Sequence, residues 1–404
     1  MRSLLNDTLR DDPLATEAAS IVRSCVHCGF CNATCPTYQL TGDELDGPRG
    51  RIYLMKSWLE ADAAGDTTQI HLDRCLGCRS CETTCPSGVR YGRLLDLVRP
   101  RVHAAAGLSN WQRVTRALLI TVIPYPWRWR AAVTLGRWLR PVLPDAVKRL
   151  YSLSDPPPAF VATPRARRVL LLGGCAQAVL NPSIDAAAAR VFDRLGITLE
   201  RHPGVECCGA LPYHLGDEPV AVRIAKANID AWWPAIEAGA EAIMATSSGC
   251  GVQLRDYAQL LRGDAHYGPR AARVVALVRD PIELVDSQQL RAHVRGQGQR
   301  VAVQTPCTLQ HGQGLGGRIE PLLRELGWDV LSAHEGHLCC GSAGSYSILQ
   351  PAMAGELRTR KLGNLMANAP TEIVTANIGC QLHLVARASV PVRHWLEVLA
   401  AALD

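Results

Sequence analysis

The chain has 404 residues, 48% of them hydrophobic, and a formal charge of +6, so it is long enough for two or three globular domains. Its hydrophobic share excludes wholesale disorder, and no apolar run approaches the roughly 18 residues that a membrane-spanning helix needs. The unusual feature is the 16 cysteines. Because residues 1–10 lack the apolar run of a signal peptide, we expect reduced, metal-binding thiols in the cytoplasm instead of disulfides.

The first predicted domain contains a cysteine motif that occurs twice. Its spacing is Cys-x2-Cys-x2-Cys-x3-Cys-Pro, and the two copies begin at Cys25 and Cys75. In two-cluster ferredoxins, the first three cysteines of such a run hold one [4Fe–4S] cluster and the fourth binds the other cluster. The spacing therefore predicts one cluster on Cys25, Cys28, Cys31 and Cys85, and a second on Cys75, Cys78, Cys81 and Cys35. Zinc and disulfides are the alternatives, but zinc has no use for the third cysteine or the Cys-Pro pair.

The 39 residues between the two motifs contain a predicted helix. Ile52, Met55 and Leu59 recur at helical spacing, and Gly47-Pro48 precedes them as a helix-start signal. We expect this apolar stripe to face a core. Residues 1–98 are accordingly predicted to form a mostly α-helical dicluster ferredoxin domain.

Residues 99–150 carry an excess of positive charge. Ten Lys or Arg residues and one acidic residue give +9, which leaves about −3 for the rest of the chain. Four of the nine Trp residues lie in the same segment, namely Trp111, Trp127, Trp129 and Trp138. Clustered Trp beside Arg favours a lipid surface or a partner protein over a solvated face, and nucleic acid is not expected. Together with a Pro-rich stretch that follows, residues 99–165 are predicted to form a basic helical segment and a linker.

Two units of similar sequence follow the linker, and we place them at residues 166–290 and 298–404. Each begins with a short apolar strand that leads to a cysteine, continues to a Cys-Cys-Gly triplet, and has a last cysteine after another strand. The matched cysteines are offset by 132, 132 and 130 residues. Strands alternate with helical stretches, which predicts two α/β units with mainly parallel strands. The whole chain is therefore expected to be an α+β multidomain protein.

Each Cys-Cys-Gly unit supplies four cysteines. Adjacent cysteines are strained as a mutual disulfide, but both can reach a metal if the following glycine takes an unusual backbone conformation. We expect a further iron–sulfur or other redox centre in these units, and a buried structural role is the alternative for any one cysteine. The first set is Cys175, Cys207, Cys208 and Cys250, and the second is Cys307, Cys339, Cys340 and Cys380.

These motifs resemble a known family. Tandem Cys-Cys-Gly units are similar to those of heterodisulfide reductase subunits, the iron–sulfur subunit of anaerobic glycerol-3-phosphate dehydrogenase, and lactate-utilisation proteins. The order of the parts, with the stretches 47–56 and 306–313, most resembles the iron–sulfur subunits of glycolate oxidase. In one respect the chain departs from the heterodisulfide reductase pattern, because Ser247 and Asn377 stand where that pattern has cysteine. Heterodisulfide chemistry is therefore not carried over.

The resemblance implies an electron-transfer subunit with no assigned catalytic residue of its own. A flavin-containing partner subunit would oxidise glycolate to glyoxylate, and electrons would pass through this chain toward a quinone or another acceptor. The expected location is the cytoplasm, with peripheral attachment to the cytoplasmic face of the inner membrane. Three alternatives stay open: a self-contained reductase that resembles heterodisulfide reductase, the iron–sulfur subunit of a lactate or glycerol-3-phosphate dehydrogenase, and a cluster-bearing sensor or scaffold.

Overall fold

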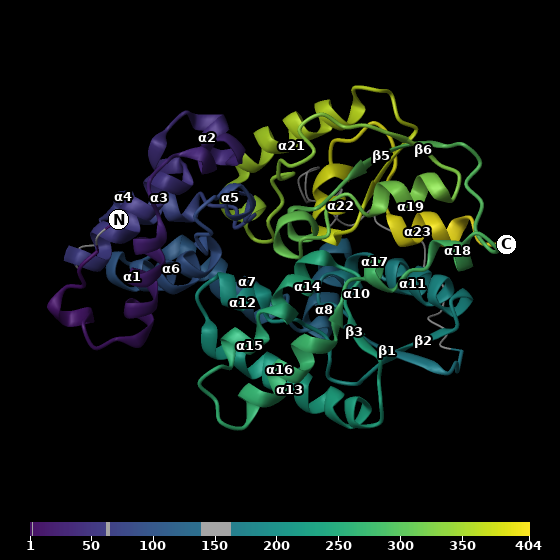
Figure 1. Ribbon diagram of the computed structural model, residues 1–404, viewed down its shortest axis with the longest axis horizontal. Helices are drawn as coiled ribbons and strands as arrows, with labels where there is room; N and C mark the ends of the chain where they lie inside the picture. The colour runs from purple at the N-terminus through teal and green to yellow at the C-terminus, as the bar shows by residue number, and fades with distance from the viewer. Residues whose placement is uncertain (2, 62–64, 139–162) are drawn as a thin grey trace. The chain divides into compact units, whose positions relative to one another are not determined.

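The computed structural model describes residues 1, 3–61, 65–138 and 163–404 (Figure 1). The chain divides into two compact units. The first unit comprises Met1–Ala117, His214–Gly216 and Glu335–Lys361, and the second comprises Leu118–Tyr213, Asp217–His334 and Leu362–Asp404. Each unit is therefore built from segments that are distant in the sequence.

The N-terminal part of the first unit is helical throughout its described residues. Its elements are η1 (Asp7–Leu9), α1 (Pro13–Ser24), η2 (Phe30–Thr34), α2 (Pro36–Thr41), η3 (Glu44–Asp46), α3 (Pro48–Ala61), α4 (Asp66–Asp73), α5 (Ser80–Thr84) and α6 (Tyr91–Ala106). Helices α1, α3, α4 and α6 share one hydrophobic core. Ile52, Met55 and Leu59 of α3 are buried in it, so the predicted helix and its core-facing stripe are confirmed.

Two helices follow in the basic segment. They are α7 (Asn110–Val122) and α8 (Pro126–Trp138), joined by a short turn. The start of the predicted basic segment belongs to α6, whereas residues 139–162, with the end of that segment and most of the Pro-rich linker, lie outside the described residues. None of the described helices combines the length and the apolar character that crossing a bilayer requires.

The second unit contains two four-stranded parallel sheets with the same topology. Their strand orders are β2-β1-β3-β4 and β6-β5-β7-β8. The strands are β1 (Arg167–Leu171), β2 (Ile197–Arg201), β3 (Ala242–Met244), β4 (Val278–Arg279), β5 (Arg300–Gln304), β6 (Asp329–Leu331), β7 (Glu372–Thr375) and β8 (Val392–His394). All pairs within the two sheets are parallel, so the prediction of two tandem α/β units is confirmed.

Helices connect these strands. Those of the first repeat are α10 (Gln177–Leu180), α11 (Ser183–Arg194), α12 (Ala210–His214), α13 (Glu218–Glu237), α14 (Ser248–Arg255), α15 (Tyr257–Leu260), α16 (Tyr267–Leu277), α17 (Pro281–Leu284) and α18 (Ser287–Leu290). Those of the second repeat are η6 (Thr308–Gly312), α19 (Ile319–Glu325), α20 (Tyr346–Leu349), α21 (Pro351–Met366), α22 (Ile378–Val385) and α23 (Trp395–Ala401).

The two repeats of the second unit pack together over one hydrophobic core. Val169 and Phe192 of the first repeat and Val301 and Trp395 of the second belong to the same buried cluster. The repeats also end alike, because the helix after each last strand begins with a capping box. Such agreement in local detail follows from the sequence repeat and places corresponding cysteines at corresponding strand ends.

Candidate metal centres

The two ferredoxin loops have the same backbone path. In the first loop, His27 and Gly29 have φ angles of 62° and 85°, and in the second Gly77 and Arg79 have φ angles of 64° and 60°. Residues other than glycine, such as His27 and Arg79, seldom adopt this left-handed backbone conformation unless the surrounding structure requires it. The repeated curl wraps the three cysteines of each loop around a hollow in the surface.

The fourth cysteine of each motif lies with the other motif. Cys35 and Cys85 both have extended backbone, and each ends a short helix and precedes a proline. The first hollow is lined by Cys25, Cys28, Cys31 and Cys85, and the second by Cys75, Cys78, Cys81 and Cys35. Cys81 also lines the first hollow. The arrangement supports the exchange of fourth ligands, which we carry forward as a proposal.

The electrostatics of both hollows fit a cationic group. Burial, followed by the thiolates of Cys25, Cys85 and Cys28, raises the pKa of Cys31 to about 11. Burial and the neighbouring thiolates, with Cys78 and Cys75 first, also raise the pKa of Cys81. Four crowded thiolates repel one another unless a positive ion lies between them. Iron supplies that charge, and an all-sulfur donor set suits an iron–sulfur cluster.

Polar side chains surround the second hollow, and sequence analysis assigned no role to them. Arg51 is almost completely buried, and its Nη1 lies 3.9 Å from Sγ of Cys35. The hydroxyl of Tyr91 donates to Sγ of Cys75 at 3.6 Å. Burial alone would lower the pKa of Arg51, but Cys75, Tyr91 and Cys35 raise it above its ordinary value. Arg51 belongs to the stretch 47–56, which was noted only for its family resemblance.

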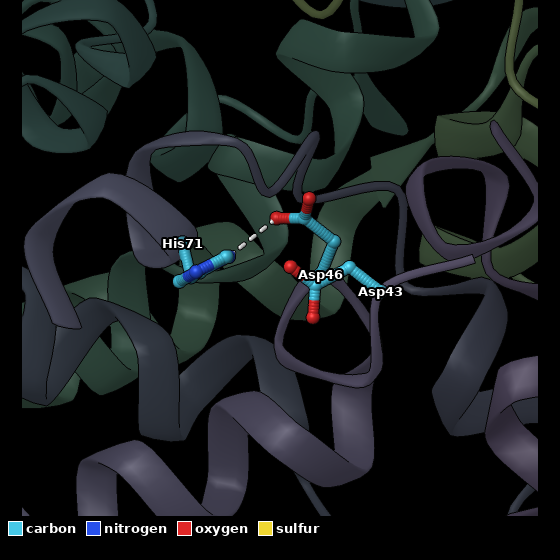
Figure 2. A group of neighbouring side chains, drawn as sticks. All are labelled: Asp43, Asp46 and His71. Atoms are coloured by element: carbon cyan, nitrogen blue, oxygen red, sulfur yellow. Dashed lines mark hydrogen bonds and ion pairs between the residues drawn. The ribbon is translucent and has the colours of Figure 1, made fainter. Parts of the chain in front are cut away.

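A carboxylate–histidine group lies next to Arg51 (Figure 2). Asp43, Asp46 and His71 have ligand atoms within 4.8 Å of one another. Figure 2 shows His71 pointing toward Asp46, whose Oδ1 is 2.8 Å from Nδ1 of the ring. Arg74 donates to the other oxygen of Asp46 at 3.0 Å, while Asp43 accepts from a backbone N–H of η3. Because protein donors already neutralise Asp46, we interpret this group as an ion-pair network.

The first Cys-Cys-Gly set converges at the carboxyl ends of parallel strands. Cys175 follows β1, Cys207 and Cys208 follow β2, and Cys250 lies in α14 after β3. Contacts with the thiols of Cys175 and Cys208, together with burial, raise the pKa of Cys207. The neighbouring Cys208 and burial raise the pKa of Cys250 in the same way. The four sulfurs are therefore close neighbours, as the predicted centre requires.

The glycine after each cysteine pair has the backbone conformation that the motif predicts. Gly209 has φ of 84° and Gly341 has φ of 90°, which side chains other than glycine rarely adopt. Each glycine N–H donates to the sulfur two residues earlier, at 3.3 Å for Cys207 and 3.5 Å for Cys339. The turn thus lets a backbone N–H support one of the two neighbouring sulfurs in each pair.

Ser247 and Asn377 have structural roles at the positions where the heterodisulfide reductase pattern has cysteine. Asn377 caps α22 by accepting from the backbone N–H groups of Gly379 and Cys380. Its amide donates to the hydroxyl of Ser248 at 3.2 Å, which joins the two repeats. Ser247 is the N-cap of α14 and hydrogen-bonds the thiol of Cys250. Only the Asn377 side chain caps its helix, and neither residue adds a fifth sulfur to its set.

The second Cys-Cys-Gly set is divided between the compact units. Cys307 and Cys380 belong to the second unit, whereas Cys339 and Cys340 lie in Glu335–Lys361 of the first. Within that first unit, buried Tyr346 is close to the sulfurs of both Cys75 and Cys339, and burial together with these sulfurs raises its pKa. The sequence contains no local signal for this association, because it depends on contacts between distant segments.

Comparisons with known proteins agree with this arrangement. A family model described as "4Fe-4S dicluster domain" matches residues 21–89. A second family model, described as "Cysteine-rich domain", matches residues 169–255 and again residues 301–385. These matches confirm the predicted iron–sulfur cofactors and the order of one dicluster domain and two cysteine-rich repeats. The ligand sets and exact domain boundaries stay predictions.

Relatives with a similar sequence extend over the whole chain. The "Glycolate oxidase iron-sulfur subunit" of Escherichia coli (strain K12) is 48% identical over 410 residues, covering 100% of both chains. The "Probable glycolate oxidase iron-sulfur subunit" of Bacillus subtilis (strain 168) is 32% identical over 394 residues, covering 89% of this chain and 88% of the relative. "Lactate utilization protein A" of Geobacillus kaustophilus (strain HTA426) is 23% identical over 244 residues, covering 58% of this chain and 99% of the relative.

Proposed function

Because the chain belongs to the family of glycolate oxidase iron–sulfur subunits, we propose that it is the electron-transfer subunit of a glycolate-oxidising complex. The full-length similarity to the E. coli subunit is the observation that carries this proposal. In the complex, a flavin-containing partner oxidises glycolate to glyoxylate. Electrons from the flavin then reach a quinone or another acceptor by way of this chain.

The chemistry of the cysteine sets supports a relay. When bound, iron–sulfur clusters carry electrons singly, whereas oxidation of a hydroxy acid delivers a pair that a flavin accepts. The dicluster loops hold their sulfurs in two adjacent hollows that share Cys81 as a lining residue. Residues Cys25, Cys28, Cys31 and Cys85 would hold one cluster, and Cys35, Cys75, Cys78 and Cys81 the other. The first Cys-Cys-Gly set supplies four further sulfurs in the second unit.

The self-contained reductase is the weaker candidate. The heterodisulfide reductase pattern has a fifth cysteine in each unit. This chain has Ser247 and Asn377 at the corresponding positions. Both residues are committed to capping or to hydrogen bonds at helix starts. Four sulfurs per set suit electron storage or transfer better than that chemistry.

The isolated chain is expected to show no glycolate oxidation. Purified without its partner and loaded with iron, it should not reduce an artificial dye with glycolate, lactate or glycerol 3-phosphate, because clusters alone do not accept the substrate's electron pair. Dithionite serves as the positive control, since it should reduce the same sample. Dye reduction by glycolate in flavin-free protein would instead support the self-contained enzyme.

We further propose that α7 and α8 attach the chain to an anionic membrane surface. Trp111, Val114 and Leu118 form an apolar stripe on α7, and all three are more than half exposed. On the opposite face, Arg116 is buried and pairs with Asp73. This helix therefore buries one of its two arginines and points an apolar stripe outward, whereas an ordinary surface helix buries its apolar stripe.

Helix α8 shows the same feature with more aromatic surface. Trp127, Leu135 and Trp138 lie at helical spacing and are 65%, 61% and 83% exposed. The guanidinium of Arg128 stacks on the rings of Tyr125 and Trp127, at 4.5 and 5.1 Å from their centroids. Exposed Trp beside Arg matches a lipid headgroup region, where rings insert and cations meet anionic lipid.

The wild-type chain is expected to sediment with anionic phosphatidylglycerol vesicles at low salt and to be released as the salt concentration rises. Changing Arg128 and Arg130 to Gln should weaken vesicle binding about thirtyfold, at about 1 kcal/mol for each basic residue. Trp127→Ser with Trp138→Ser should also weaken it. The control is Leu4→Ser, which removes an equally exposed apolar side chain elsewhere. If the Arg and Trp variants bind as the wild type does, docking to the flavin partner becomes the better account of these helices.

A further inference from the structure

The two ferredoxin hollows differ in the charge that surrounds them. We propose that Arg51 and Tyr91 give the cluster held by Cys35, Cys75, Cys78 and Cys81 a higher reduction potential than the cluster held by Cys25, Cys28, Cys31 and Cys85. This inference rests on the proposed function, because it requires that both clusters are present. It predicts the direction of electron transfer between the two clusters, which neither the cysteine spacing nor the relatives provide.

The second hollow has a buried positive charge directly beside a ligand sulfur. The Arg51 side chain is 1% exposed, and its Nη1 lies 3.9 Å from Sγ of Cys35. Its ion-pair partner Asp46 is fully buried, at 3.5 Å, but also pairs with Arg74 at 3.0 Å. Two guanidinium groups thus share one carboxylate. Asp46 is therefore not reserved for Arg51, whose positive charge lies beside a cluster ligand, where water screens it little.

The hydrogen bonds around Arg51 hold the guanidinium in place. Its Nε donates to the backbone carbonyl of His71 at 2.7 Å, and its Nη2 donates to the hydroxyl of Thr37 at 3.1 Å. That hydroxyl in turn donates to the backbone carbonyl of Asp46 at 2.7 Å. Thr37 is therefore a positioning residue. A charge fixed by three elements needs no rearrangement when the neighbouring cluster gains an electron.

Two donors reach another ligand of the second set. The buried hydroxyl of Tyr91 lies 3.6 Å from Sγ of Cys75, and the backbone N–H of Gly77 lies 3.4 Å from the same sulfur. Hydrogen bonds to ligand sulfurs withdraw electron density from the iron. They raise the reduction potential for this reason, and nearby positive charge does the same.

The first hollow lacks these features. The arginine that lines it, Arg49, is 34% exposed and pairs one-to-one with Glu44 at 2.6 Å, so this pair adds no net charge. Within the described part of the chain, no side-chain N–H or O–H donates to the sulfurs of its four cysteines. Cys28 is exposed, and water there also favours the reduced state. A fixed buried charge has the larger effect, because interactions in buried surroundings are several-fold stronger than those through water.

Reduction adds one negative charge to a cluster, so the positive charge of Arg51 beside Cys35 stabilises the reduced state of the second cluster more than its oxidised state. An electron supplied to the first cluster then moves to the second, and no bond is formed or broken. Tyr346 lies near both Cys75 and Cys339 within the same compact unit. Tyr346 is therefore a common neighbour of the second set and of one cysteine of the second Cys-Cys-Gly set.

The test is a reductive titration of the full-length chain with its clusters in place, followed by electron paramagnetic resonance. Cys35→Ala and Cys85→Ala identify the signals of the second and first clusters, because each variant removes one of them. In the wild type, the second cluster should become reduced at a higher potential than the first. Arg51→Gln should lower the reduction potential of the second cluster and leave the potential of the first cluster unchanged. The matched control, Arg49→Gln, should leave the second cluster unchanged.

Further variants keep the test independent of how well Arg51→Gln folds. Tyr91→Phe should lower the potential of the same cluster by a smaller amount, and Arg51→Lys, which keeps the charge, should largely restore the wild-type value. The inference is wrong if the two clusters have equal potentials, or if Arg51→Gln and Tyr91→Phe leave the second cluster unchanged. A wild-type chain with the signal of only one cluster would contradict the two-cluster proposal itself, so the two failures are distinguishable.

Discussion

Replacing Cys35 by Ala is expected to remove the cluster whose other ligands are Cys75, Cys78 and Cys81, although Cys35 belongs to the first motif. The chain should lose about four Fe per molecule, because a [4Fe–4S] cluster with three thiolates is not retained. Cys85→Ala should cause an equal loss for the cluster on the opposite set. The physical reason is the extended backbone at both residues, which carries each fourth sulfur to the other hollow.

Double variants distinguish the exchanged ligands from two separate sets. Cys35→Ala combined with Cys75→Ala should lose no more iron than either single variant, because both residues hold one cluster. Cys35→Ala combined with Cys25→Ala should lose about eight Fe. Iron analysis of the purified full-length chain provides the measurement. The opposite pattern, with the larger loss for Cys35 and Cys75, would show that each motif holds its own cluster.

Much of the fold could be predicted from the sequence because the signals are local or repeated. The helical spacing of Ile52, Met55 and Leu59 predicts a core-facing stripe, and all three are buried in α3. The offsets between the Cys-Cys-Gly units predict two equivalent α/β repeats, and the two parallel sheets have the same strand order. A periodic pattern of this kind depends on neighbouring residues and does not require knowledge of distant contacts.

The charged surroundings of the second hollow could not be predicted in the same way. Arg51 contacts the sulfur of Cys35, which is 16 residues earlier in the sequence, and the backbone carbonyl of His71, which is 20 residues later. Nothing in its local sequence distinguishes a buried guanidinium from an exposed one. The association of Glu335–Lys361 with the N-terminal unit is hidden for the same reason. The motifs indicate which residues bind metal, whereas the charges that tune the metal depend on tertiary contacts.

The outward-facing stripe of α7 shows a different limit. Clustered Trp and Arg indicate a surface role, but composition does not give their orientation. The structure buries Arg116 against Asp73 and exposes Trp111. The usual amphipathic pattern would predict a buried Trp111 and an exposed Arg116, because apolar side chains usually face the core. The ion pair stabilises the buried guanidinium and allows the apolar face to point outward.

Glycolate is expected to reduce the clusters of this chain only when the flavin partner is present. In the proposed complex, the partner would take the electron pair from the substrate, and the cysteine-bound clusters would then accept electrons singly. In the complete complex, anaerobic addition of glycolate should therefore bleach the visible absorption of the clusters. The matched control is the isolated chain at the same iron content, which dithionite should bleach and glycolate should not.

The absorbance change on adding glycolate, with and without the partner, tests the central claim most directly. The electron-transfer account predicts bleaching in the complex and none in the isolated chain. Bleaching of the isolated, flavin-free chain by glycolate would contradict this account. So would a complex whose clusters respond to dithionite but not to glycolate.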